Sequence, residues 1–394
     1  MQLNTFLDAK PLYYKEIDHK RVHDAYARLK PHIKHPKTVH IVGTNGKGST
    51  GRILAHLAVN SEQVAGSNET FSVGHYSSPH ILKFNERIWL DGKDVSENVL
   101  EEAHQRLFGL LGKEISEALS YFEYTTLLAL VVFEKCDLMV LEAGLGGEFD
   151  ATNVCDKELT IVTPIGIDHQ AFLGKSIEEI ASTKIRSIQK QVLLAPQPYV
   201  EVVEVAKEIA KEKDAKIYRC RVGTPAHQKL ETIAKAKGWG DYLIDNATVA
   251  MQALEILGIK YDIDDLKTLE LFGRFYALTE NIRIDVGHNP LAARAIEQAL
   301  DKQVVLIYNS LDDKEFEEVL QTLKPKVKRV EIIKIESQRA ATLGKIEKAL
   351  QNVGLEYRYF KNEIKENENY LVFGSFYVVE AFLRRVGIPA YMVG

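Results

Sequence analysis

The chain has 394 residues, of which 45% are hydrophobic and 27% charged, and its formal net charge is −5. A chain of this length predicts about two or three domains with substantial hydrophobic cores. The slightly negative balance argues against nucleic acid as a bulk electrostatic partner. Three scattered cysteines, Cys136, Cys155 and Cys220, argue against a disulfide framework or a zinc site.

No segment has the pattern of an export signal or a membrane span. The first ten residues, MQLNTFLDAK, lack a basic flank followed by an apolar core. The apolar run TTLLALVVF, residues 125–133, is too short to cross a bilayer. We therefore expect a cytoplasmic enzyme with no membrane partner.

The first informative segment is a strand, a glycine-rich loop and a helix. Residues 37–43, KTVHIVG, are apolar and β-branched, which predicts a buried strand. Residues 49–59, STGRILAHLAV, carry apolar side chains at helical spacing. Between them lies TNGKG, residues 44–48, and this order is typical of phosphate sites, where backbone N–H groups and a helix N-terminus converge on the anion.

This loop departs from the usual pattern G-x-x-x-x-G-K-[ST], because Gly48 follows Lys47 and Ser49 comes one place late. We predict that Lys47 reaches the outer phosphates of a nucleotide and that Ser49 or Thr50 helps to hold magnesium. The structural alternative is an ordinary turn between a strand and a helix, with a surface lysine.

The next polar segment is HYSSPHILKFNERI, residues 75–88. It combines Ser77, Ser78 and His80 around a proline with a later Asn-Glu-Arg run, which favours a binding loop between elements. A surface hairpin is the alternative, and the residues alone do not exclude it.

Two later strands are each followed by polar side chains that suit a ligand site. The strand within 137–144 carries Glu142 near its end and leads into a glycine-rich turn, where an acid is a natural magnesium ligand. The strand within 158–166 leads to Asp168 and His169. Ligands of open α/β sheets bind outside the carboxyl ends of the strands. The alternatives are a solvated loop carboxylate and a structural histidine.

Strand-like and helical patterns alternate along most of the chain, which predicts βαβ units and a mainly parallel sheet. We expect helix in 203–237 and in 246–258, the latter ending at Gly258 as a C-cap would. The alternation restarts after 271, with apolar strand runs beginning at 281, 302, 328 and 369. The predicted fold is α/β, with an N-terminal P-loop domain at 1–271 and a smaller Rossmann-like domain at 272–394.

The predicted second domain opens with a candidate ligand set. Arg274 follows the linker directly, and an arginine fork matches the oxygens of a phosphoryl group. Asp285, His288 and Asn289 lie at a strand end, where an aspartate suits ribose hydroxyls. Surface salt bridges are the alternative for Arg274 and Asp285.

Taken together, the motifs GTNGKGS, SSPHILKFNERI, LEAGLGGEFDATN, GIDHQAFLG, GRF and DVGHNP resemble, in order, those of folylpolyglutamate and dihydrofolate synthases. That family belongs to the Mur ligase superfamily of ATP-dependent amide-forming enzymes, and the resemblance covers nearly the whole chain. It implies a Mur ligase-like fold. It also implies that ATP, L-glutamate and dihydropteroate or a folate are the small-molecule partners, with no nucleic acid or membrane, and we expect a monomer.

The resemblance also implies roles for particular residues. Lys47, Lys184, His169 and Arg274 would be catalytic, and two magnesium ions would be held by Ser49, Ser78, Glu142, His169 and Lys184. Lys184 falls where the family carries a lysine carbamylated by carbon dioxide. The nucleotide would be bound by Gly43, Thr44, Asn45, Gly46, Lys47, Gly48, Ser49, Thr50, Asn246, Arg274, Asp285 and His288.

Two positions depart from the family pattern. Glu148 stands where the family usually has arginine, which reverses a charge beside the proposed metal site. Arg186 lies in TKIRS, where the family usually has EKAGI, close to Lys184. Both departures bear on substrate detail more than on reaction type, because Lys47, Glu142 and His169 are retained.

Three other functions stay open on sequence grounds. Another ligase of the superfamily could act on a different carboxylate or amino acid. A non-catalytic ATP-binding regulator could keep the fold, although it would not need the metal-binding set. A simple P-loop kinase could use the first domain, but the second domain would be superfluous to it.

Overall fold

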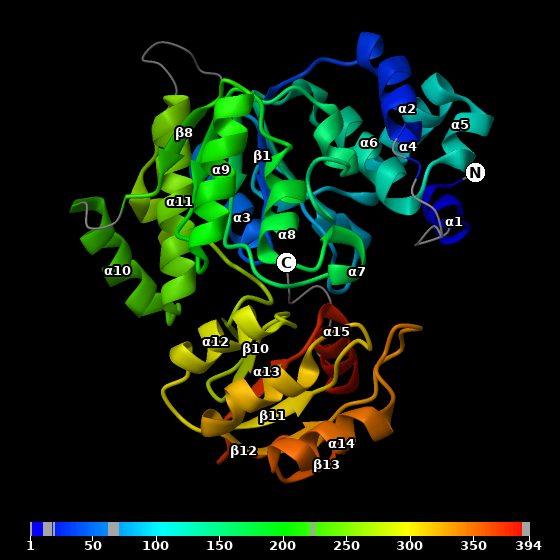
Figure 1. Cartoon of the computed structure of the whole chain (residues 1–394). Coiled ribbons are helices and arrows are strands. Elements are labelled where there is room, and N and C mark those ends of the chain that lie inside the picture. The colour runs from blue at the N-terminus through cyan, green and yellow to red at the C-terminus, as the bar shows by residue number, and fades with distance from the viewer. Residues whose placement is uncertain (1, 11–17, 19, 62–70, 222–224, 388–394) are drawn as a thin grey trace. The chain divides into compact units, whose positions relative to one another are not determined.

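A computed structural model describes residues 2–10, 18, 20–61, 71–221 and 225–387 (Figure 1). The chain divides into two compact units. The first unit comprises Met1–His80, Phe84–Gly223 and Asn246–Leu266, and the second comprises Ile81–Lys83, Thr224–Asp245 and Lys267–Gly394. The limits predicted from the sequence stay a prediction, and this division differs from them by assigning 81–83, 224–245 and 267–271 to the second unit.

The first unit is built on an eight-stranded sheet in the order β4-β3-β2-β5-β1-β6-β7-β8. The pairs β2–β5, β5–β1, β1–β6, β6–β7 and β7–β8 are parallel. The pairs β2–β3 and β3–β4, at one edge of the sheet, are antiparallel. The central strands are buried except for the exposed Lys37 at the start of β1, as their apolar, β-branched sequences predict. The strands are β1 (Lys37–Val42), β2 (Val73–Tyr76), β3 (Ile88–Leu90), β4 (Lys93–Asp94), β5 (Leu138–Glu142), β6 (Leu159–Val162), β7 (Gln191–Leu194) and β8 (Lys216–Arg219).

Helices pack against this sheet through two apolar cores. One core includes Phe6, Tyr124 and Leu128, and the other includes Ile180, Val192 and Ala206. The helices are α1 (Leu3–Asp8), α2 (Arg21–Leu29), α3 (Lys47–Val59), α4 (Glu97–Leu111), α5 (Lys113–Ala118), α6 (Tyr121–Val132), α7 (Gln170–Leu173), α8 (Ile177–Ile185) and α9 (Val200–Glu212), with 3-10 turns η1 (Lys30–His32), η2 (Phe84–Arg87), η3 (Phe133–Lys135), η4 (Ala151–Val154) and η5 (Ile263–Lys267).

Local sequence explains where the site-bearing helices begin. Helix α8 starts with a capping box, in which the Ser176 side chain accepts from the Glu179 backbone and the Glu179 side chain accepts from the Ser176 backbone. Helix α3 starts at Lys47 after Gly46, whose φ of 85° lies in the left-handed region that glycine tolerates. Helix α11 (Asp241–Leu257) ends before Gly258, as predicted, and Gly258 has a φ of 70°.

The second unit contains a six-stranded sheet in the order β13-β12-β11-β14-β10-β9. Every pair is parallel except β9–β10. Its elements are α10 (Pro225–Lys237), β9 (Tyr276–Ala277), β10 (Ile282–Ile284), α12 (Pro290–Ala299), β11 (Val304–Tyr308), α13 (Phe316–Leu323), η6 (Lys324–Lys326), β12 (Val327–Ile332), α14 (Leu343–Val353), β13 (Tyr357–Tyr359), β14 (Tyr370–Phe373) and α15 (Phe376–Arg385). The two mainly parallel sheets confirm the α/β prediction.

One predicted element is wrong in part. The sequence from 203 to 237 was expected to be helical, but strand β8 separates α9 from α10. β8 lies at the sheet edge, and none of its four residues is buried, so it lacks the apolar run that marked the central strands. Among the helices that the described ranges contain, none has the length and apolarity needed to span a membrane.

Candidate active site

The phosphate-type loop connects β1 to α3 and is held by the segment that follows β6. Thr44 N and Asn45 N both donate to Pro164 O, at 3.0 and 3.2 Å. The Thr44 hydroxyl donates to Gly166 O and accepts from Gly166 N, each at 3.1 Å. A side chain at Gly43 would not fit, because its Cβ would lie 2.0 Å from Thr163 Oγ1. The loop is therefore fixed in shape by its neighbours.

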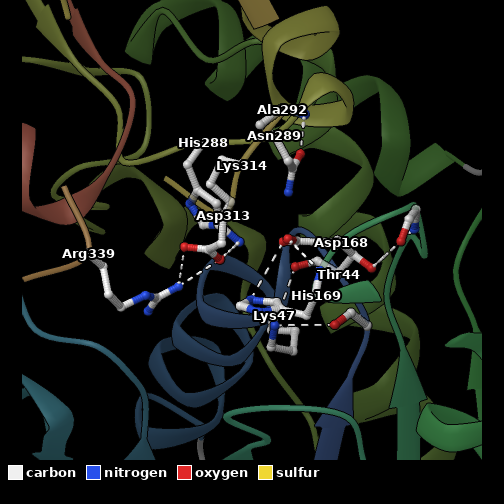
Figure 2. Close-up of polar contacts among 12 residues, drawn as sticks. Thr44, Lys47, Asp168, His169, His288, Asn289, Ala292, Asp313, Lys314 and Arg339 are labelled. Carbon is white, nitrogen blue, oxygen red and sulfur yellow. Dashed lines mark hydrogen bonds and ion pairs between the residues drawn. The ribbon is translucent and has the colours of Figure 1, made fainter. Parts of the chain in front are cut away.

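The polar groups of this loop fit an anion. Lys47 Nζ donates to Gly43 O and Thr44 O at 3.2 and 3.3 Å, which folds the lysine back over the loop (Figure 2). Helix α3 has 13 residues, and its N-cap residue, Gly46, has no side chain that could accept a hydrogen bond. No capping side chain therefore accepts from the first backbone N–H groups of the helix, at the end where the helix dipole favours an anion. Thr50 Oγ1 is buried and has no hydrogen-bond partner among the described residues.

Asn246 lies against the same loop. Its Nδ2 donates to Ser49 Oγ at 2.8 Å, and Ser49 Oγ donates to Gly46 O at 3.2 Å. A Cβ at Gly46 would come within 2.6 Å of Asn246 Oδ1, so the close approach requires glycine. The structure therefore brings Asn246, predicted to contact the nucleotide, next to Ser49, although they are far apart in sequence.

Glu142 and Ser78 come together at the carboxyl ends of two paired strands. Strand β5 ends at Glu142, β2 ends at Tyr76, and the two run parallel with Tyr76 opposite Leu141. Ser78 N donates to Glu142 Oε2 at 3.3 Å, and Glu142 is buried. This pair of oxygen-bearing side chains suits a hard cation such as magnesium.

The segment 75–88 includes both features that the sequence left open. Strands β2 and β3 form an antiparallel pair, so the hairpin alternative describes part of its backbone. Arg87 is buried, and its Nε donates to His80 Nδ1 at 2.8 Å. Burial and the Arg87 charge lower the pKa of His80 to about 4, so this imidazole is neutral near pH 7.

His169 adopts a left-handed backbone, with φ 52°, at the start of α7. Its N–H donates to Asp168 Oδ1 at 2.9 Å, and its Nε2 lies 3.8 Å from Asp168 Oδ2 (Figure 2). A non-glycine residue in this region is uncommon and marks functional sites more often than chance. The Asp168 carboxylate thus holds the His169 backbone and lies beside the ring that was predicted to be a metal ligand.

Lys184, on the last turn of α8, is buried, and its Nζ donates to Gly43 O at 3.0 Å. Lys184 is therefore not a solvent-exposed lysine on the polar face of α8. The two departures from the family pattern lie around it. Glu148 N donates to Thr183 O at 2.9 Å, while the Arg186 guanidinium lies 3.7 Å from Glu212 on α9. Arg186 thus pairs with an exposed acid of the neighbouring helix.

In the second unit, Asp285 organises the loops that carry Arg274 and His288. Asp285 Oδ2 accepts from Phe275 N at 2.8 Å and from the Tyr242 hydroxyl at 3.0 Å, and Oδ1 accepts from Gly287 N at 2.7 Å. Burial raises the pKa of Asp285, and the Arg274 charge opposes that rise. These bonds hold the backbone on both sides of β10.

Arg274 and His288 lie on the two loops that Asp285 holds. The Arg274 guanidinium lies 5.3 Å from the centre of the Phe376 ring, and its Nη1 donates to Gly273 O at 3.1 Å. His288 Nδ1 lies 3.2 Å from Val286 O, and Asn289 Oδ1 caps α12 by accepting from Ala292 N (Figure 2). Asn289 therefore has a structural use in this unit.

Sequence reasoning missed Lys314, on the loop after β11. This lysine is buried, and its Nζ lies 3.8 Å from Asp313 Oδ2. Asp313 also accepts from Arg339 Nη2 at 2.7 and 2.8 Å (Figure 2). Strand β11 is paired with β14, the adjacent strands at which the strand order of this sheet reverses, and such points bind ligands in open α/β sheets. The run SLDDKEF offered the signal, an acid-lysine cluster at a strand end.

The part of the chain that the structure describes contains no group of three or more His, Cys, Asp or Glu side chains arranged to hold a metal ion. The predicted ligand set includes only two side chains of those types, Glu142 and His169, beside two serines and a lysine. The set therefore stays a prediction.

Comparison with known proteins decides the family. No family model matches the chain. The dihydrofolate synthase/folylpolyglutamate synthase of Escherichia coli strain K12 is 31% identical over 407 residues, covering 93% of this chain and 91% of that protein. The chain belongs to the dihydrofolate synthase/folylpolyglutamate synthase family. It is an ATP-dependent ligase of folate metabolism, as members of this family are.

Solved structures of the family support the same fold over the whole length. The Helicobacter pylori folylpolyglutamate synthetase is 39% identical, with a TM-score of 0.77 and coverage of 98% of both chains. A bifunctional folylpolyglutamate synthase/dihydrofolate synthase with Mn, AMPPNP and L-glutamate bound is 25% identical, with a TM-score of 0.78 and 98% coverage of both chains. The predicted Mur ligase-like fold is thereby confirmed, and ATP and divalent-metal binding follow from family membership.

Proposed function

We propose that this chain joins the amino group of L-glutamate to the carboxylate of dihydropteroate, of a folate, or of both. The carboxylate attacks the γ-phosphorus of ATP, which forms an acyl phosphate and releases ADP. The glutamate amine then attacks the acyl carbon, phosphate leaves, and the amine loses a proton as the amide forms. The observation that carries this proposal is the set of Lys47, Glu142 and Ser78 at adjoining strand ends, in a chain related to the family over most of its length.

The first step brings a carboxylate toward a phosphate, so negative charge must be screened. Lys47 would place its ammonium at the outer phosphates, and the uncapped start of α3 would direct N–H groups at them. Thr50 Oγ1 would supply a further donor from its buried position. Fixed donors of this kind are the main protein contribution to phosphoryl transfer.

Two magnesium ions would complete the screening, because a bound divalent cation neutralises phosphate charge. Ser49, Ser78, Glu142 and His169 would hold them, with Ser78 N already bonded to the Glu142 carboxylate. A relative binds manganese together with an ATP analogue and glutamate, which supports a divalent metal at this kind of site.

Lys184 would enter the metal site as a carbamate. A neutral amine adds to carbon dioxide and loses one proton, which leaves an anionic group with two oxygens and one N–H. That remaining N–H would preserve the bond from Lys184 Nζ to Gly43 O. The carbamate oxygens would suit magnesium, which an ammonium would repel.

The second unit would contribute Arg274 and His288 to the nucleotide, with Asp285 holding both loops in place. Lys314 would hold an anionic group at the β11–β14 strand ends, and the carboxylates of the incoming glutamate have that chemistry. We also propose that the enzyme acts as a cytoplasmic monomer on small molecules, with no nucleic acid or membrane partner.

The test is the release of ADP with ATP, glutamate and dihydropteroate present, and with each omitted in turn. A ligase of this kind needs all three, whereas a kinase would not need glutamate and a nucleotide-binding regulator would release no ADP. Lys47→Ala serves as the internal control, and we expect its turnover to fall by about 100-fold or more without loss of folding. Near-normal turnover of folded Lys47→Ala would overturn the assignment of the phosphate loop.

A further inference from the structure

Lys157 is a buried cation without a carboxylate partner. It is 1% exposed, and among the residues that the structure describes the hydrogen bonds of its ammonium go to an amide and a backbone oxygen and not to a carboxylate. Its Nζ donates to Asn153 Oδ1 and, at 3.1 Å, to Ser187 O. Burial lowers the pKa of Lys157 to about 8. The charges of Asp156 and Asp150 oppose this fall in pKa, but burying a lysine that no ion pair neutralises is still costly.

The acceptors of Lys157 belong to two segments that carry proposed metal ligands. Asn153 lies in η4, after the glycine-rich loop that follows Glu142, and its Nδ2 donates to Glu148 O at 2.7 Å. Ser187 lies just beyond α8, and its hydroxyl donates to Lys184 O at 2.8 Å. Lys157 therefore connects the glycine-rich loop to the end of the helix that carries Lys184.

The backbone of Lys184 is held closely at this connection. A Cβ at Gly147 would lie 2.2 Å from Lys184 O, so the glycine-rich loop touches the backbone of this residue directly. Glu148 N donates to Thr183 O at 2.9 Å, one residue before Lys184. Small shifts of the loop would therefore move the Lys184 backbone, and its side chain with it.

We propose that Lys157 is a positioning residue, which sets the place of Lys184 in the metal site by joining Asn153 to Ser187. The inference rests on the proposed role of Lys184 as a metal ligand. Lys157 does not touch substrate or metal in this scheme. It acts through Ser187, whose hydroxyl fixes the backbone oxygen of Lys184 at the last turn of α8.

The chain offers a matched control in Lys10. Lys10 is also buried, burial lowers its pKa to about 8, and its Nζ donates to Ser116 O and Leu119 O at 2.6 and 2.7 Å. Both lysines thus donate to backbone oxygen at the C-terminal end of a helix, Lys157 at α8 and Lys10 at α5. Lys10→Met should lower the melting temperature in the same way as Lys157→Met, without touching the segments that bear Lys184.

The experiment measures Mn²⁺ binding directly, by electron paramagnetic resonance titration of the full chain with ADP present. Lys157→Met should raise the Mn²⁺ dissociation constant by about 10-fold, the size expected when a partner that orients a metal ligand is lost. Ser187→Ala should change it in the same direction with little effect on folding, and Lys10→Met should leave it unchanged. Wild-type Mn²⁺ affinity in folded Lys157→Met, or in Ser187→Ala if Lys157→Met does not fold, would overturn the proposal.

A double variant separates this inference from the proposed function. Lys184→Ala should itself weaken Mn²⁺ binding, and adding Lys157→Met to it should weaken binding no further, because the second residue acts through the first. An unchanged Mn²⁺ affinity in Lys184→Ala would instead refute the metal role of Lys184. A further loss in the double variant would show that Lys157 acts by another route, against the proposal.

Discussion

Lys47 and Lys184 donate hydrogen bonds to the same backbone oxygen, that of Gly43, at 3.2 and 3.0 Å. The two ammonium groups therefore lie within about 6 Å of each other, as the two bonds require. Two like charges at this distance repel. A carbamate on Lys184 would turn that repulsion into attraction and would leave Lys47 as the cation that faces the phosphates.

The carbamate proposal predicts chemical rescue. Lys184→Ala should be nearly inactive, and short-chain carboxylic acids at high concentration should restore part of the rate by supplying the missing oxygens. Lys207→Ala, which removes an exposed lysine paired with Glu204, should behave like the wild type. The measurement is the rate of ADP release against added acetate or propionate.

Two results would refute the carbamate. One is full activity of folded Lys184→Ala. The other is experimental density for a plain amine at Lys184 while magnesium and nucleotide are bound, in which case the lysine would keep only its bond to Gly43 O.

Glu142 should set the magnesium requirement. Glu142→Gln keeps the shape of the side chain but removes the charge that a divalent cation needs. We expect a lower maximal rate and a higher magnesium concentration for half-maximal activity. Glu208→Gln, on the exposed face of α9, provides the matched substitution. If both variants show the wild-type magnesium dependence, the metal binds elsewhere.

Replacing Lys314 should raise the KM for glutamate more than the KM for ATP. Lys314→Met removes a buried cation from the β11–β14 strand ends, and a lost charged contact should raise the KM for glutamate by about 10-fold or more. The KM for ATP should change little. Lys345→Met, which removes an exposed lysine bonded to Asp312, should leave both constants unchanged. A selective rise in the KM for ATP would assign Lys314 to the nucleotide instead.

The lowered pKa of Lys10 predicts that its contribution to the free energy of unfolding depends on pH. Burial lowers the pKa of Lys10 from 10.5 to about 8 in the folded chain. Between these values the unfolded chain binds more protons than the folded chain, so the contribution of Lys10 to stability rises with pH across that window. Below pH 8 both states are protonated and the full cost of burial remains.

The measurement compares wild type with Lys10→Met by denaturant unfolding from pH 7.5 to 9.5. The free energy of unfolding of the wild type, minus that of the variant, should increase with pH by less than about 1.4 kcal/mol per pH unit, the limit for one proton. Taking the difference cancels the opposing effect of Cys136 and Cys155, whose pKa values burial raises. A difference that is flat or falls with pH would show that Lys10 is not destabilised in the folded chain.

The predictions from sequence were most accurate for elements whose structure depends on residues close together in the chain. The strand, loop and helix around Lys47 form as expected, because apolar runs and glycines act within a few residues. Glu142 and His169 could be placed at strand ends for the same reason. Strand β8 was missed because its exposed edge position leaves it without an apolar run.

The missed parts of the site depend on contacts between distant residues. The run SLDDKEF marked Lys314 as part of a charged cluster, but lysine is almost never fully buried, so the burial of Lys157 and Lys314 was not predictable from local sequence. Asp285 was expected to meet a ribose, and its three bonds to Tyr242, Phe275 and Gly287 become visible only once the fold is known. Tertiary packing decides such roles, and one sequence does not contain that information in a local pattern.

The most direct test of the account follows the oxygen atoms of the acceptor carboxylate. Dihydropteroate or a folate labelled with ¹⁸O in that carboxylate would be converted with unlabelled ATP and L-glutamate, and the released phosphate would be analysed by mass spectrometry. An acyl phosphate predicts that one ¹⁸O appears in phosphate and one stays in the amide carbonyl. Phosphate without ¹⁸O, alongside product that gains a glutamate, would contradict activation of the carboxylate by phosphoryl transfer.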